Sequence, residues 1–127
     1  EKAKLYIPAD GVTPRNEHAA EGMDSWHIVE KPQAGYEEMC FFHHFEDEGI
    51  AAIFNPDINA GVAISYDAKN LPFFTEWKMM GEYDYVLGLE PGNCLPDGRD
   101  GMRETGMLEF LEPGEEKNFQ IKFEFTR

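Results

Sequence analysis

From residue 39 onward, apolar and polar residues alternate along the chain with a period of two. Such alternation is typical of antiparallel strands that have one buried and one solvated face. We therefore predict an all-β chain folded as an antiparallel β-sandwich, with less than about a fifth of its residues in helices. Clusters of Gly, Pro, Asn and Asp separate the predicted strands, which are 39–45, 49–54, 61–66, 73–80, 83–89, 107–111 and 118–125.

A turn signal predicts how the last two strands pair. Pro113 and Gly114 suit a type II turn, because proline fixes its own φ and glycine accepts the positive φ that follows. We therefore expect segments 107–111 and 118–125 to form a hairpin.

Three consecutive acids, at residues 46–48, separate the first two strands. Like charges repel one another in a core but are well solvated at the end of a hairpin. We therefore expect this run to be the exposed tip of a hairpin between 39–45 and 49–54, rather than a metal site.

The first 38 residues follow a different pattern. Three prolines interrupt any long element there, and only residues 5–7 and 26–29 have strand character. Residues 17–22 predict a helical turn that ends at a glycine. We interpret the chain, 1–127, as a single β-sandwich module in which 1–38 is an irregular connection and 39–127 holds the strands.

Composition and charge exclude several classes of protein. A chain of 127 residues with 42% hydrophobic residues can build one core. Its formal charge is 11 − 25 = −14, and no basic patch interrupts the acidic sequence, so we expect no nucleic-acid partner. No apolar run approaches the roughly 20 residues of a membrane helix, so no membrane partner is expected either. Only Cys40 and Cys94 occur, which predicts reduced thiols and a cytoplasmic protein rather than a disulfide framework.

The histidine and cysteine pattern does not predict a metal ion or a nucleophile. No two histidines have the i, i+4 spacing of a zinc-protease helix, and His43 and His44 should point to opposite faces of a strand. Cys40 lies between Met39 and Phe41, so we interpret it as a small buried hydrophobic residue. No glycine-rich phosphate loop is present, and we therefore expect no cofactor.

The most informative stretch is 85–98, where an apolar strand ends at Glu90 and a Pro-Gly-Asn loop follows. A carboxylate at the end of a strand is held more rigidly than one in a mobile loop, which suits a general base. The same carboxylate could instead accept backbone N–H bonds from the loop, and spacing alone leaves both interpretations open.

Several motifs in this stretch and beyond it resemble the aldose 1-epimerase (galactose mutarotase) family. In order along the chain they are Leu89-Glu90, Pro96-Asp97, the Leu-Glu-Pro-Gly-Glu segment 111–115 and the Phe-Glu-Phe segment 123–125. An uncharacterised bacterial branch of aldose-epimerase-like proteins is still more similar. Its motifs are matched by Asn55-Pro56, Leu71-Pro72, the Trp-Lys-Met-Met segment 77–80 and the Leu-Glu-Pro segment 89–91.

The resemblance implies a galactose-mutarotase-like β-supersandwich, of which this chain would be the C-terminal part. It also implies a sugar bound in a groove, with Glu90 as the base that takes the proton of the anomeric hydroxyl. In the family a histidine protonates the ring oxygen, the ring opens, the C1–C2 bond rotates, and reclosure gives the other anomer. No histidine here has the neighbours of the family's catalytic one, so we expect that residue upstream of Glu1.

The resemblance also implies sugar-binding residues. A second family carboxylate corresponds to Glu38, or less closely to Glu37, and binds sugar hydroxyls. The loop after the base departs from the family pattern, and Asn93 would restore the missing amide. Trp77 and Lys78 could form a stacking plane and a cation for an acidic sugar, or could be a buried tryptophan beside a lysine that extends to solvent. Arg15 is a further candidate.

Two functions compete. The first is a carbohydrate-active module that binds a sugar and, in the full-length protein, interconverts anomers through Glu90. The second is a non-catalytic carbohydrate-binding or sensing domain with the same fold, which the absence of the family histidine leaves open. A structural β-sandwich without sugar binding ranks third. Half of a supersandwich would leave a sheet edge uncovered, so we expect a homodimer or pairing with an N-terminal part.

Overall fold

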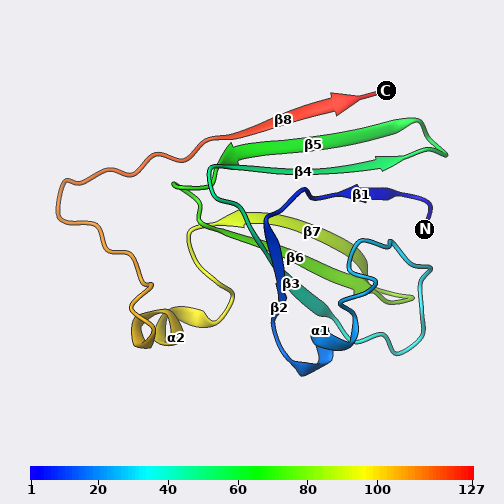
Figure 1. Cartoon of the computed structure of the whole chain (residues 1–127), viewed down its shortest axis with the longest axis horizontal. Coiled ribbons are helices and arrows are strands. Elements are labelled where there is room, and N and C mark those ends of the chain that lie inside the picture. The colour runs from blue at the N-terminus through cyan, green and yellow to red at the C-terminus, as the bar shows by residue number, and fades with distance from the viewer.

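Eight strands form two four-stranded antiparallel sheets (Figure 1). One sheet has the order β1-β4-β5-β8 and the other β2-β3-β6-β7 in this computed structural model, which describes residues 1–127. Strand residues make up 43% of the chain and helical residues 9%, so the predicted all-β sandwich is confirmed. The elements are β1 (Lys4–Tyr6), β2 (Gly11–Pro14), α1 (Glu17–Glu21), β3 (Met39–His44), β4 (Glu48–Asn55), β5 (Ala60–Asp67), β6 (Phe73–Met80), β7 (Tyr85–Gly92), α2 (Gly98–Glu104) and β8 (Ile121–Thr126).

The hydrophobic core lies where the two sheets meet. Ala51 of β4 and Ile64 and Tyr66 of β5 are buried there against Phe74 of β6. The rings of Tyr66 and Phe74 stack with their centroids 6.0 Å apart. Each of these residues is apolar, but the same inner face of β6 also carries the buried charged residues Glu76 and Lys78, so the buried face does not follow apolar alternation in every strand.

The predicted hairpin of 107–111 with 118–125 is wrong. Residues 107–111 form no strand, because the N–H groups of Met107 and Leu108 donate to the Met102 carbonyl at 2.8 and 3.0 Å and fold the segment back onto α2. Strand β8 pairs instead with β5. The predicted turn itself is present: Gly114 has a φ of 84°, and the N–H of Glu115 donates to the Glu112 carbonyl at 2.9 Å.

The acidic run at 46–48 is exposed as expected, but it is not a hairpin tip. It connects β3 in one sheet to β4 in the other, and these two strands do not pair. Alternation along a strand specifies its buried face and says nothing about its partner, so a crossing between sheets and a hairpin look alike in the sequence.

The N-terminal 38 residues are more regular than predicted. Strand β1 covers part of 5–7, and β2 was not predicted; its Pro14 is tolerated because β2 is an edge strand. The short helix at 17–22 is confirmed as α1, which Asn16 caps by accepting the Ala19 N–H at 2.9 Å. Neither α1 nor α2 is long and apolar enough to cross a membrane.

Candidate functional site

The candidate site lies on the outer face of the β2-β3-β6-β7 sheet. Cross-strand partners in antiparallel sheets share a face, so register decides which side chains meet. One row across the sheet joins Cys40, Trp77 and Gly88, and the next row joins Thr75 to Glu90. The residues next to these positions along each strand, such as Phe41 and Phe74, point to the core and are buried.

Glu38 and Trp77 form a direct hydrogen bond on this face. The indole Nε1–H of Trp77 donates to Glu38 Oε2 at 2.7 Å. Glu38 immediately precedes β3, and Trp77 lies on the neighbouring strand β6. The bond fixes the direction of the carboxylate and leaves its other oxygen free to accept from a ligand.

The carboxylate of Glu90, an exposed residue, lies back over β7 beside Gly88. A Cβ placed on Gly88 would overlap Glu90 Oε1 and would come within 3.3 Å of the Cβ of Trp77. Gly88 therefore leaves the space in which the Glu90 carboxylate turns toward Trp77.

Arg15 lies beside Cys40 on the same sheet and contacts the loop that follows β7. Its Nη1 is 4.0 Å from the Sγ of Cys40, and its Nη2 donates to the Pro96 carbonyl at 3.3 Å. Its Nε is also 3.9 Å from Asp97 Oδ1. These contacts tie the end of β2 to the loop that follows β7, so the Pro-Asp motif of the sequence holds a cation beside the sheet.

Cys40 lies near several charged groups of this face. Burial raises the pKa of its thiol, as do the nearby carboxylates of Glu38 and Glu90, whereas Arg15 lowers that pKa. The net direction is upward, so the thiol stays protonated at neutral pH. Cys40 is 6% exposed, which confirms that it is a buried apolar residue. We refer to Glu90, Glu38, Trp77 and Arg15 as the Glu90 face.

Three other residues predicted for the site make no direct contact with this group. Lys78 points to the inner face of the sheet, is 1% exposed, and donates to the Ser25 carbonyl at 2.8 Å. Asn93, which directly follows β7, donates to Glu109 Oε2 at 3.2 Å. Glu37 is exposed next to Glu38.

His44 is a histidine on the outer face that the sequence reasoning did not connect with Glu90. It lies two residues along β3 from Phe42, which shares a row with Thr75 and Glu90. Its Nε2 is 3.0 Å from Thr13 Oγ1. Side chains alternate in direction along a strand, so the even numbering that His44 shares with Phe42 could have placed it on the outer face.

A buried polar pair lies on the opposite, inner face. His43 Nε2 is 2.8 Å from Glu76 Oε2, and both side chains are fully buried. Burial raises the pKa of Glu76, whereas His43, Lys78 and His27 lower it. As predicted, His43 and His44 point to opposite faces. No three His, Cys, Asp or Glu side chains gather as a metal site would require.

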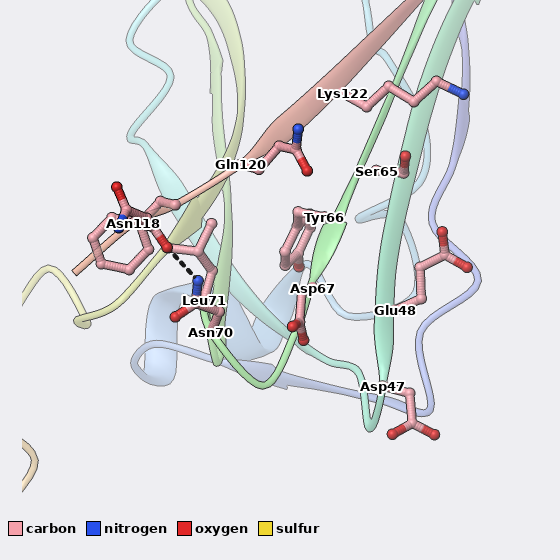
Figure 2. Close-up of a pocket in the computed structure, with 11 residues that line it drawn as sticks. Asp47, Glu48, Ser65, Tyr66, Asp67, Asn70, Leu71, Asn118, Gln120 and Lys122 are labelled. Atoms are coloured by element: carbon pink, nitrogen blue, oxygen red, sulfur yellow. Dashed lines mark hydrogen bonds between the residues drawn. The ribbon is translucent and has the colours of Figure 1, made fainter.

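A large open pocket lies apart from the Glu90 face. It measures about 840 Å³ and is lined by residues of β5, the start of β8 and the segments next to them (Figure 2). Asn70 donates to the Asn118 carbonyl at 2.6 Å across its rim. Asp47, Glu48 and Asp67 also line it, and none of the residues predicted for the site does.

Comparisons with known proteins place the chain in a family. The family model described as "Domain of unknown function (DUF4432)" matches residues 1–125. A crystal structure described as a "putative aldose 1-epimerase" from Klebsiella pneumoniae subsp. pneumoniae MGH 78578 is similar, with a TM-score of 0.86 and 27% identity. That similarity covers 99% of this chain and 34% of the other, so this chain spans about a third of that protein's length. The comparison with curated proteins finds no match. The chain thus belongs to the DUF4432 family, and its fold is similar to part of an aldose 1-epimerase-like protein.

Proposed function

We propose that this chain is a carbohydrate-active module that binds a sugar on the Glu90 face, with Glu90 as the base for interconversion of anomers. The observation that supports this most is the convergence of two carboxylates, an indole and a guanidinium on one sheet face. Sugars bind to such sets because carboxylates and guanidinium groups bond to hydroxyls while an aromatic plane covers the ring's C–H groups.

The proposed chemistry gives each residue a separate task. Glu90 takes the proton from the anomeric hydroxyl as the C1–O5 bond breaks, and O5 takes a proton from an acid. Rotation about C1–C2 and the reverse steps then return both protons and give the other anomer. Glu38, held by Trp77, accepts from a sugar hydroxyl, and Arg15 donates to a ligand oxygen.

A non-catalytic sugar-binding module is the second candidate function. It is favoured by the surroundings of the two histidines on this sheet: His43 is buried against Glu76 on the inner face, and His44 Nε2 is 3.0 Å from Thr13 Oγ1, so neither has a contact with Glu90. Without an acid, binding on the Glu90 face would continue while ring opening would not be accelerated.

Two measurements on the wild-type chain distinguish the candidates. Polarimetry of a freshly dissolved aldose measures the rate of mutarotation, and calorimetry measures sugar binding. Accelerated mutarotation with binding supports the enzyme, and binding without acceleration supports the second candidate. A panel of neutral, acidic and phosphorylated aldoses of which none binds would contradict both.

Gly88 provides a test of carboxylate positioning. We expect Gly88→Ala to keep the free energy of unfolding near that of wild type, because the displaced atom is the free end of a side chain. The new methyl group would push the Glu90 carboxylate away from Trp77, so the mutarotation rate, or sugar affinity in a binding module, should fall about tenfold or more. Gly101→Ala, in the exposed helix α2 with its nearest neighbour at 3.5 Å, is the matched control and should leave that readout unchanged. A mutarotation rate, or a sugar affinity, that Gly88→Ala leaves unchanged would contradict the proposal that Gly88 positions the Glu90 carboxylate.

A further inference from the structure

Strand β8 is a sheet edge that neither a short length nor a proline protects. Edge strands expose a row of unpaired N–H and C=O groups, and proteins usually limit pairing there with short strands or prolines. The other three edge strands have such features: β1 is three residues long, β2 contains Pro14, and β7 contains Pro91. Strand β8 has six residues, no proline and a partner on one side only, and it is the outermost strand of its sheet in Figure 1.

The side chains of β8 separate into an apolar row and a charged row. Ile121, Phe123 and Phe125 share the face that Ile64 and Tyr66 present to the core. Ile121 packs against that core, but Phe123 is 58% and Phe125 is 81% exposed. An apolar row that continues a core face into solvent is typical of an interaction surface.

The charged row is self-complementary. Lys122 and Glu124 are 3.1 Å apart along the strand, and both side chains are exposed. In an antiparallel pair of identical strands with Phe123 opposite Phe123, each Lys122 faces a Glu124 of the other copy. The four charges then alternate in sign around a rectangle, and Ile121 faces Phe125.

Neighbouring registers lose this match. A shift that centres the pair on residue 124 places the two Glu124 carboxylates directly opposite each other. The intermediate register, shifted by one residue from the pairing centred on Phe123, places Lys122 opposite Phe125. Charged side chains of one copy would then lie opposite apolar side chains of the other. We therefore propose that β8 is an interface between two copies of this chain, paired antiparallel with Phe123 at the twofold axis.

Charge reversal tests this register directly. Lys122→Glu places two acids opposite each other at both ends of the axis, and Glu124→Lys places two lysines there. Because like charges across an interface are unfavourable, we expect each single variant to weaken dimerisation about tenfold or more in sedimentation velocity at low salt. Both residues are exposed, so folding should not change.

Two complementary combinations should restore pairing. The double variant K122E/E124K recreates opposite charges at both positions and should dimerise like wild type. An equimolar mixture of the two single variants should form a heterodimer in native mass spectrometry, because each acid then faces a lysine of the other chain. The mixture excludes loss of the Lys122–Glu124 pair within one chain as the explanation, because neither single variant regains that pair when the heterodimer forms.

Other outcomes would overturn the proposal. A wild-type chain that is monomeric at every concentration would show that a second copy does not occupy this edge. A dimer that both charge reversals leave intact would place the interface elsewhere. A dimer that neither the double variant nor the mixture restores would exclude the register centred on Phe123.

Discussion

Replacing Glu90 by Gln is expected to slow mutarotation by at least about a hundredfold, with sugar binding retained. The amide keeps the shape of the side chain and can still hydrogen-bond a hydroxyl, but it cannot take the proton of the anomeric hydroxyl. The space above Gly88 that holds the carboxylate also accommodates the amide. Polarimetry gives the rate and calorimetry the affinity of the same preparations.

The matched control for this variant is Glu104→Gln, which makes the same chemical change at an exposed residue at the end of α2. It should leave both the rate and the affinity unchanged. Equal mutarotation rates for wild type and Glu90→Gln would remove Glu90 from the mechanism.

Breaking the His43–Glu76 pair is expected to have the largest effect on stability. Glu76→Ala leaves a buried imidazole without its partner, and His43→Ala leaves a buried carboxylate without its partner. Each should lower the free energy of unfolding by about 3–5 kcal/mol, because both side chains are fully buried and cannot recover the lost interaction from water. Urea unfolding followed by circular dichroism measures the loss.

An exposed ion pair serves as the comparison. Lys2 lies 3.2 Å from Asp57 with both side chains more than half exposed, so Lys2→Ala should shift the unfolding midpoint far less than either buried variant. Similar midpoint shifts for Lys2→Ala and Glu76→Ala would contradict the role assigned to the buried pair.

Strand alternation predicted individual strands better than their partners. Strand β6 has the predicted bounds, 73–80, because it is rich in aromatic and other apolar residues and Pro72 and Gly81 flank it. The segment 107–111 has similar apolar content but is folded back onto α2 by backbone bonds to Met102, which no side-chain pattern reveals. The pairing of β8 with β5 depends on the packing of the whole chain and not on its local sequence.

The candidate site was predictable only in part. The motifs pointed to Glu90 and Glu38, which the fold brings to the same outer face of the β2-β3-β6-β7 sheet, and their roles stay predictions. Lys78 follows Trp77 directly, and adjacent residues of a strand point to opposite faces of the sheet. Trp77 and Lys78 therefore cannot both lie on the outer face. The buried Glu76 was missed because a carboxylate on an apolar face is expected to be rare, and only the cross-strand position of His43 makes it tolerable.

The most direct test of sugar binding on the Glu90 face is a titration of the ¹⁵N-labelled chain with an aldose, followed through its two tryptophan indole N–H signals. Trp77 lies on the Glu90 face and donates to Glu38, whereas Trp26 packs against the inner-face His43 with ring centroids 4.9 Å apart. Trp26→Phe assigns the two signals. We predict that the Trp77 signal shifts and saturates with sugar while the Trp26 signal stays in place. A saturable shift confined to Trp26, or no shift of Trp77 with any aldose, would contradict the proposed site.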